Sequence, residues 1–414
     1  MIKIAILSDI HFGKNSRSKE FAIPGQNIVD EAIGGASLYG GLEQTLRQHA
    51  PDYIFCPGDL TSSGNPLEFK LCLEKIYGLA ENVGVKKENV LYCYGNHDVN
   101  RRITDLSKSS NDLLNRDPTD VENAFVDKYY YEMSHMWLCN ANFVDNVSAY
   151  NSYFSASGPV SGAGIFVRDN MEVYLLNSGL LCTSEQEIRH GKITQLQTKW
   201  LEDELKKRSE ESNWKIVMLH HQPFNYPFPT IGLDVSTLEE GAELTELCSQ
   251  FGVHLVIHGH RHHPRAKTRI EGQSNKPTTY ISAGSLSVNS YGRANGQIPN
   301  TFHLIELLDD NKYIKLTTYE YQLGAGWTSS IQSRAALPLE HEMYFGMETI
   351  NHTRAKELIK LFPRNQAIFY DEIEIQLKSL PITNLNNLLE AEFKLQLSGS
   401  FPSAIMIHSE KDEV

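Results

Sequence analysis

Residues 90–98, VLYCYGNHD, are the stretch of sequence that decides the fold. The apolar run that opens it has the length and the β-branched and aromatic character expected of a buried strand. Asn96, His97 and Asp98 follow at the carboxyl end of that strand, where open α/β sheets place catalytic groups. Asparagine offers a neutral oxygen ligand, histidine an acid or base near neutral pH, and aspartate a partner for the histidine ring. Taken alone, the stretch is better explained as a capped turn with an exposed histidine, so its interpretation depends on the rest of the chain.

Four other predicted strands end in residues of the same chemical kind. They are followed by Asp9 and His11 (strand 3–8), Asp59 (strand 53–56), His220 and His221 (strand 216–219), and His260 and His262 (strand 255–257). One such end is commonly a cap or a turn. Five ends built from oxygen and nitrogen ligands in one chain are hard to explain in that way, and we expect them to share a site.

The order of the predicted elements indicates an α/β protein. Strand-like runs alternate with segments of helical periodicity at 42–49, 69–81 and 195–207. This alternation is typical of a sheet whose strands are connected by crossover helices. Further strand-like runs at 280–286, 302–308 and 313–321 complete the predicted sheet structure.

Two segments depart from this alternation. Residues 101–153 begin polar and become rich in aromatic residues, which predicts an inserted helical lobe over the mouth of the site. Its aromatic side chains would either pack a small separate core or stack on a substrate. From residue 324 the chain has stretches of helical periodicity and no cluster of ligand-type residues. We therefore expect a catalytic domain over residues 1–323 and a C-terminal accessory region over 324–414, for packing or for docking a partner protein.

Composition and charge describe an ordinary globular protein. Of the 414 residues, 41% are apolar and 21% are charged, and the formal net charge is −13. This acidity gives no general attraction to nucleic acid or to anionic membranes, although it leaves room for a local basic groove. The six cysteines lack the spacing of a zinc site, which predicts reduced thiols. No apolar run is long enough to cross a membrane and no secretory segment opens the chain, so we expect a cytoplasmic protein without a membrane partner.

The predicted ligands indicate the kind of metal. Carboxylate, imidazole and amide ligands without thiolate suit divalent ions such as manganese, iron or zinc. Two such ions, about 3.5–4 Å apart in binuclear sites, need a carboxylate between them and stabilise both the attacking and the leaving oxygen. We therefore expect two divalent cations, with manganese favoured over iron or zinc.

The order of these motifs resembles that of the calcineurin-like metallophosphoesterase superfamily. The motifs are Asp9-x-His11, Gly58-Asp59, Gly95-Asn96-His97-Asp98, His220 and Gly259-His260-x-His262. The resemblance spans roughly residues 1–320 and implies a four-layer α/β/β/α sandwich with a binuclear metal centre. It implies one cation held by Asp9, His11 and His262, another held by Asn96, His220 and His260, and Asp59 as the bridge between them.

The resemblance also implies a mechanism. A metal-bound hydroxide attacks phosphorus in line, and His97 stabilises charge or gives a proton to the leaving oxygen. Asp98 is expected to orient the ring of His97. The fourth motif offers two adjacent histidines as the ligand. In the superfamily the ligand is usually the first histidine after the strand. This favours His220 over His221.

The resemblance determines the reaction type better than the substrate. The chain lacks the Gly-Asp-x-Val-Asp-Arg-Gly and Asn-His-Glu motifs of phosphoprotein phosphatases, and residues 58–66 (GDLTSSGNP) resemble the cyclic-nucleotide and small phosphodiesterase branch. Residues 8–13 (SDIHFG) also resemble the repair nucleases. The acidic net charge favours a phosphodiesterase on nucleotides or small diesters over a metal-dependent DNA or RNA nuclease. A non-catalytic scaffold is disfavoured because every ligand position is filled and His97 is present.

Overall fold

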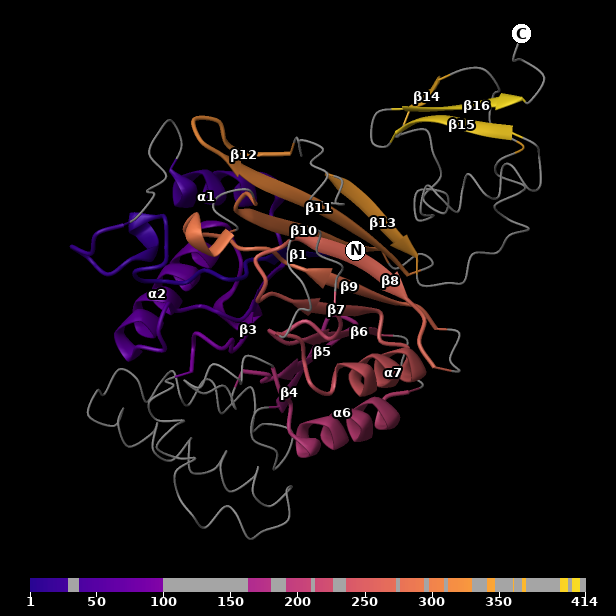
Figure 1. Cartoon of the computed structure of the whole chain (residues 1–414), viewed down its shortest axis with the longest axis horizontal. Coiled ribbons are helices and arrows are strands. Elements are labelled where there is room, and N and C mark those ends of the chain that lie inside the picture. Colours follow the sequence, from indigo (N-terminus) through magenta and orange to yellow (C-terminus); the bar gives the residue numbers. More distant parts are fainter. Residues whose placement is uncertain are drawn as a thin grey trace.

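The computed structural model of the chain describes two large β-sheets and a short C-terminal one (Figure 1). The described residues are 1–28, 37–99, 163–179, 191–209, 213–225, 236–272, 276–293, 298–308, 312–329, 341–346, 360, 367–369, 395–400 and 404–409. The inserted lobe expected at 101–153 lies outside them and stays a prediction. None of the described helices is long and apolar enough to cross a membrane.

The first sheet has seven strands and contains the strand of the stretch quoted at the outset. Its strands are β1 (Ile2–Ile6), β2 (Tyr53–Pro57), β3 (Val90–Cys93), β10 (Thr301–Leu308), β11 (Tyr313–Gln322), β12 (Gly326–Thr328) and β13 (Glu342–Gly346). β1, β2 and β3 are parallel, and α1 (Leu38–His49) and α2 (Pro66–Asn82) connect them. The order β12-β11-β10-β1-β2-β3, with β13 also paired to β11, places the carboxyl ends of β1, β2 and β3 at one edge.

Both helices on this sheet begin where the sequence supplies a cap. Ser37 and Asn65 each accept a hydrogen bond from a backbone N–H of the first turn, at 3.0 and 2.8 Å, and Pro66 is the first residue of α2. The predicted helices at 42–49 and 69–81 are therefore confirmed, and each begins a few residues earlier at its cap.

The second sheet has six strands in the order β4-β5-β6-β7-β9-β8. They are β4 (Ala163–Arg168), β5 (Met171–Leu176), β6 (Trp214–Met218), β7 (Leu255–His258), β8 (Arg265–Arg269) and β9 (Thr278–Ser282). β5, β6, β7 and β9 are parallel, with α6 (Gln195–Lys207) between β5 and β6 and α7 (Gly241–Phe251) between β6 and β7. The predicted helix 195–207 is confirmed with the same bounds, and it buries Trp200, Leu201 and Leu205.

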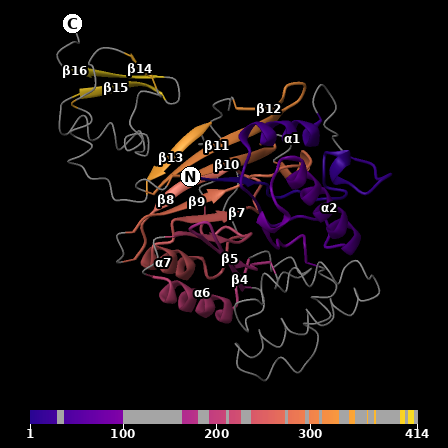
Figure 2. The same ribbon diagram turned by 180° about the vertical axis from the view of Figure 1, so that it is seen from behind.

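Alternation along the strands of the second sheet establishes the four layers. On β5, Val173 and Leu175 belong to the core shared with the first sheet, whereas Tyr174 and Leu176 belong to the core under α6 and α7. Strand residues point alternately to opposite faces, so this sheet must be covered on both sides. The first sheet is covered on its other face by α1 and α2, and Figures 1 and 2 show the two helix pairs on different sheets. The predicted four-layer α/β/β/α sandwich is confirmed.

The chain beyond residue 323 still contributes to the first sheet. β12 and β13 both pair with β11, and Trp327 packs on Phe302 and Tyr321 while its Nε1 donates to the carbonyl of Leu38 at 2.8 Å. A boundary at residue 324 therefore divides this sheet. A separate sheet follows, in the order β14-β16-β15. The remaining elements are β14 (Ala367–Phe369), β15 (Leu395–Ser400) and β16 (Ala404–Ser409), and the short 3-10 turns Lys19–Phe21, Lys87–Asn89 and Tyr291–Arg293.

Candidate metal centre

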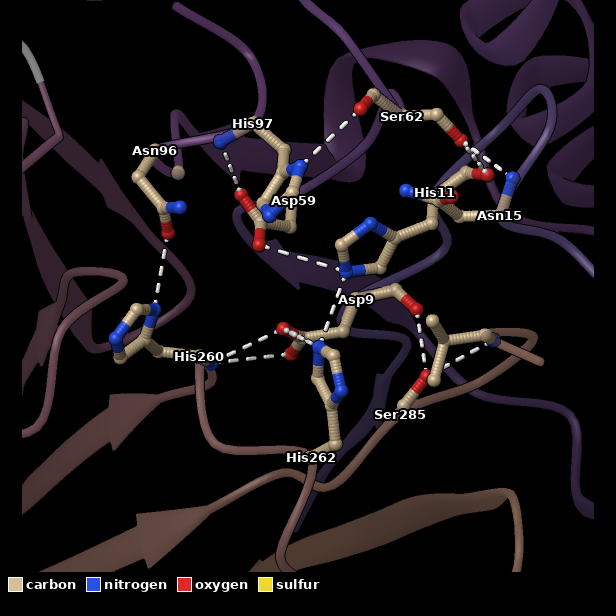
Figure 3. Close-up of polar contacts among 12 residues, drawn as sticks. Asp9, His11, Asn15, Asp59, Ser62, Asn96, His97, His260, His262 and Ser285 are labelled. Carbon is tan, nitrogen blue, oxygen red and sulfur yellow. Dashed lines mark hydrogen bonds and ion pairs between the residues drawn. The ribbon is translucent and has the colours of Figure 1, made fainter. Parts of the chain in front are cut away.

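All seven expected metal ligands lie together where the carboxyl ends of strands from both sheets meet. Figure 3 shows all of them except His220. Asp9 and His11 follow β1, Asp59 follows β2, Asn96 follows β3, His220 follows β6, and His260 and His262 follow β7. Ligand atoms that lie within 4.8 Å of one another form two groups. The first ligand group is Asp9, His11, Asp59 and His262, and the second ligand group is Asp59, His220 and His260.

The first ligand group is a tight cluster of two imidazoles and two carboxylates. His11 Nε2 lies 3.0 Å from His262 Nε2 and 3.5 Å from Asp59 Oδ2. His262 Nε2 lies 3.3 Å from Asp9 Oδ1. Two imidazole lone pairs that face each other at this distance repel unless a proton or a cation lies between them, and the carboxylates add negative charge on both sides. This donor set fits a divalent cation.

In the second ligand group, the ring of His220 is oriented from its far side. His220 Nδ1 lies 2.9 Å from the carbonyl oxygen of Pro57, which only accepts hydrogen bonds, so Nδ1 carries a proton and Nε2 faces the site. Nε2 lies 3.2 Å from Asp59 Oδ2. Asn96 extends this group, because its Oδ1 lies 2.9 Å from His260 Nδ1. Imidazole, amide and carboxylate donors together fit a second cation.

Asp59 belongs to both groups and is held there by the backbone. Its Oδ1 accepts a hydrogen bond of 2.8 Å from the backbone N–H of His97. Its Oδ2 then faces His11 on one side and His220 on the other. A buried carboxylate oxygen that faces one imidazole of each group has the position that a bridging ligand requires.

The backbone at five of the seven residues is in the left-handed region. The φ angles are 50° at Asp9, 50° at His11, 50° at Asp59, 79° at His260 and 54° at His262. Residues other than glycine rarely adopt this region, which costs about 1–3 kcal/mol each, and such residues cluster at functional sites. The strained turns end each strand abruptly and direct successive side chains into one site.

Two glycines of the motifs allow this close assembly. A Cβ atom at Gly95 would lie 2.2 Å from Asp59 Oδ1, and one at Gly259 would lie 2.3 Å from Asp9 Oδ2. No side chain fits at these distances, so each glycine lets the backbone of one motif lie directly against the carboxylate of another.

Burial and mutual proximity set the charges in the site. Burial lowers the pKa of His11 and of His260 well below the usual value, which keeps both imidazoles neutral and able to donate a lone pair. Burial also opposes the ionisation of Asp59, but the imidazoles of His220 and His97 hold its pKa well below the usual range. For His220, burial acts to lower the pKa, whereas the Asp59 carboxylate raises it to about 9. A cation would therefore compete with the His220 proton for the same carboxylate oxygen.

Asp98 does not orient His97, contrary to the expectation from the sequence. Its carboxylate accepts hydrogen bonds from the backbone N–H groups of Leu60 (3.1 Å), Thr61 (2.7 Å) and Gly95 (2.9 Å). Asp98 therefore ties the loop after β2 to the loop after β3, and burial raises its pKa to about 7. His97 and Asp98 thus have different hydrogen-bond partners although they are adjacent in sequence.

The ring of His97 is instead oriented by a backbone carbonyl. His97 Nδ1 lies 3.1 Å from the carbonyl oxygen of Ser62, so this nitrogen carries a proton and Nε2 is the nitrogen left for chemistry. The ring is half-buried and lies beside the first ligand group, with its centroid 4.7 Å from that of His11.

His221 is oriented by a serine and lies outside both ligand groups as defined above. The hydroxyl of Ser178 accepts hydrogen bonds from the backbone N–H groups of His220 (3.3 Å) and His221 (3.1 Å), and it lies 2.9 Å from His221 Nδ1. Because both of its lone pairs are occupied, its proton must go to Nδ1. This arrangement favours His220 as the ligand.

Sequence reasoning missed the serines that support the ligand turns. Ser62, Ser285 and Ser287 donate to carbonyls of the turn after β1, and Ser178 accepts from the turn after β6. Serine is common in loops, and its hydroxyl can bond to any nearby backbone group, so no spacing rule separates these serines from the others.

The family of the chain follows from its match to a family profile. The profile of the calcineurin-like phosphoesterases matches residues 2–264. The chain belongs to this family. The matched residues include both ligand groups, from Asp9 to His262. Membership of the calcineurin-like phosphoesterases confirms the resemblance found in the motifs. Together with the clustered ligands, it indicates a phosphoester hydrolase with a binuclear metal centre.

Distant likenesses to solved structures accompany the family match. A dimetal phosphatase from Danio rerio is 10% identical with a TM-score of 0.49, and the likeness covers 84% of this chain and 99% of that one. A purple acid phosphatase from seeds of yellow lupin (Lupinus luteus) is 12% identical with a TM-score of 0.46, covering 83% of this chain and 53% of the other. No curated protein sequence matches the chain. TM-scores below 0.5 are too low for either likeness to support a function.

Proposed function

We propose that this calcineurin-like phosphoesterase is a two-metal-dependent phosphodiesterase that acts on nucleotides or small diesters. The proposal rests on Asp59, whose Oδ2 lies 3.5 Å from His11 Nε2 and 3.2 Å from His220 Nε2. Its other oxygen is engaged by the backbone, so the carboxylate cannot turn away from the two imidazoles. Two adjacent cations need a ligand of this kind between them.

The ligands divide between the cations as the two groups do. The first cation would be held by Asp9, His11, Asp59 and His262, and the second by Asp59, Asn96, His220 and His260. Two carboxylates and no thiolate favour manganese, with iron or zinc as alternatives. When bound, the two cations supply positive charge for the phosphate oxygens and lower the pKa of a coordinated water.

His97 would give a proton to the leaving oxygen. The carbonyl of Ser62 keeps one proton on Nδ1, so the second proton of the imidazolium lies on Nε2 and is the one that can be transferred. The same hydrogen bond fixes the plane of the ring and so restricts the direction in which Nε2 points toward the leaving group.

The preference for diesters is inferred from the loop after β2 and from net charge. Residues 58–66 resemble the small phosphodiesterase branch, and a net charge of −13 does not favour a long polyanion as substrate. A nucleic-acid substrate is the alternative that the test must separate from this proposal.

A hydrolysis screen tests the proposal. Metal-stripped protein is reconstituted with Mn²⁺, Fe²⁺ or Zn²⁺ and offered bis-nitrophenyl phosphate, nitrophenyl phosphate, cyclic nucleotides, and single-stranded and duplex DNA. We expect the diesters and cyclic nucleotides to be hydrolysed fastest, with Mn²⁺, and a chelator to abolish turnover. Faster turnover of the monoester or of DNA would refute the substrate assignment. Full activity in chelated protein would refute the dependence on metal.

We also propose that the chain beyond β13 is an accessory region and docks a partner protein. The C-terminal sheet pairs with neither large sheet among the described residues, and it holds no member of either ligand group. Removal of the chain after residue 350 should leave hydrolysis of a small diester intact. Removal from residue 324 should destabilise the protein, because β12 and β13 leave the first sheet. Loss of metal binding in a folded chain of residues 1–350 would contradict the proposal.

A further inference from the structure

The turn Asp9-Ile10-His11 carries two ligands of the first group on strained backbone. Asp9 and His11 both have φ of 50°. The N–H groups of these two residues are held by the loop after β2, because Asp9 donates to the carbonyl of Gly58 (3.1 Å) and His11 to the carbonyl of Asp59 (2.9 Å). The carbonyls of the turn need separate donors, since buried carbonyls are costly when unpaired.

Three serine side chains supply these donors. Oγ of Ser285 donates to the carbonyl of Asp9 (2.8 Å), Oγ of Ser287 to that of Ile10, and Oγ of Ser62 to that of His11 (2.7 Å). We propose that these three hydroxyls, here called the serine cradle, are positioning residues that hold the first ligand group ready for its cation. This inference rests on the proposed function, because it presumes that the group binds a cation.

Members of the serine cradle are themselves fixed in direction. Ser285 Oγ accepts a hydrogen bond from the backbone N–H of Val288 (3.0 Å), and Ser62 Oγ accepts one from Asn15 (3.1 Å), as Figure 3 shows for Ser62. Both serines are buried. A hydroxyl that accepts one hydrogen bond has its single proton directed at the remaining acceptor, which here is a carbonyl of the ligand turn.

The serine cradle also joins the two sheets around the turn. Ser62 follows β2 of the first sheet, whereas Ser285 and Ser287 follow β9 of the second. The turn itself follows β1, and its partner ligand His262 follows β7. The strained conformation is thus held from both sides before any cation is needed. Removal of one hydroxyl should let the turn relax and carry Asp9 or His11 away from His262, without touching Asn96 or His220.

A buried serine elsewhere provides a matched control. Ser249 lies on α7, donates to the carbonyl of Lys276 (2.9 Å) and accepts from the backbone N–H of Glu271 (3.2 Å). Its hydrogen bonds repeat those of Ser62 and Ser285, away from both ligand groups. Ser249→Ala should therefore cost stability in the same way as Ser285→Ala, without a selective effect on metal.

Titration of the metal-stripped full chain with Mn²⁺, followed by calorimetry and electron paramagnetic resonance, tests the inference. Wild type should bind two ions and show the signal of a spin-coupled pair. In Ser285→Ala and in Ser62→Ala, one ion should bind about 10–100-fold more weakly, as is typical for lost outer-shell partners, and an isolated Mn²⁺ signal should precede the pair. The affinity for the other ion should change less, because it depends on the turn only through Asp59 and the backbone N–H of His260. Both affinities of Ser249→Ala should match wild type.

Several outcomes would overturn the inference. They are wild-type affinity for both ions in the two cradle variants, an equal loss in Ser249→Ala, and global unfolding of either cradle variant by circular dichroism. Failure of the proposed function would look different. Wild-type protein would then bind fewer than two Mn²⁺ ions or hydrolyse no phosphoester, whatever the serine variants did.

Discussion

The two ligand groups share Asp59 but are held by different means. In the first, the other three ligands all have φ between 50° and 54°, and the serine cradle pairs the carbonyls of the turn after β1. In the second, the rings themselves are held, with His220 Nδ1 against the carbonyl of Pro57 and His260 Nδ1 against Asn96. The first group is arranged mainly through its backbone and the second mainly through its side chains.

This difference predicts which kinds of substitution should weaken each ligand group. A backbone-held group should respond to changes in loops that never touch the cation, whereas a ring-held group should respond to changes in the imidazole and its immediate partner. Both means achieve preorganisation, because neither set of ligands has to find its orientation after the cation arrives. Four predictions test the comparison, beginning with the residue that both groups share.

Removal of the shared ligand should have the largest effect. Asp59→Asn keeps the shape of the side chain but removes its charge, so both cations should bind more weakly. Cations contribute several kcal/mol to transition-state stabilisation, so the rate on a nitrophenyl diester should fall on the order of 10⁴-fold. Elemental analysis should show the loss of both ions, whereas Asp9→Asn should lose one. Two ions retained in Asp59→Asn would show that the groups do not share a ligand.

Replacement of His97 should lower the rate without removing an ion from either group. His97→Gln should cost about 10²–10⁴-fold with an alkoxide leaving group, the usual contribution of a general acid. The cost should be smaller with nitrophenolate, which leaves without a proton. Metal content and rates with both leaving groups provide the check. A fall in metal content would place His97 among the ligands, and equal losses for both leaving groups would exclude a role as acid.

Binding of the second cation should respond differently to replacement of His220 and of His221. His220→Ala removes a facing nitrogen and should abolish binding of the second cation. His221→Ala removes only a ring that supports the turn and should weaken the same cation by about 10-fold, at the lower end of outer-shell effects. Titration with Mn²⁺ measures both. A greater loss in His221→Ala would reverse the assignment of the ligand.

The last prediction concerns a histidine outside both groups, where no effect on metal binding is expected. His303 on β10 is fully buried beside Thr318, and burial lowers its pKa from 6.5 to about 4. The unfolded chain therefore takes up a proton at this residue first as the pH falls. The contribution of His303 to the free energy of unfolding is constant above pH 6.5 and declines as the pH falls from 6.5 to 4. This shift corresponds to about 3 kcal/mol at pH 4.

Urea unfolding of chelator-treated protein at several pH values measures this decline. In His303→Gln the decline should be shallower, although other buried histidines, such as His258, still contribute to it. An identical slope in wild type and variant would show that His303 does not stay neutral in the folded state.

The convergence of the ligands could be predicted from the sequence because each lies directly after a strand. Strands such as β3 and β7 are short apolar runs, and the polar residues that follow them have no place in a core. Parallel strands bring such ends to one edge, so the position of Asn96 or His260 along the chain determined its place in the fold. The motif glycines strengthened the prediction of a shared site, since Gly95 and Gly259 lie where no other residue fits.

Other features left no signal of this kind. The role of Asp98 was misjudged because adjacency to His97 suggested a contact, whereas its carboxylate bonds three backbone N–H groups. Ser285 and Ser287 contact a turn that lies more than 270 residues away in sequence, and no local pattern reports such a contact. β12 and β13 are short, and their place in the first sheet depends on pairing with β11.

The distance along the chain between ligands has a consequence for synthesis. His11 and His262 are separated by 251 residues, and the second ligand group also needs His260. Strands of both sheets must therefore be synthesised before either cation has all its ligands. Contacts between residues so far apart in sequence also form slowly. Nascent chains stalled before residue 260 should consequently bind no manganese pair. Binding of the cations would then be a late step in the maturation of the enzyme, possible only after the two sheets have packed together.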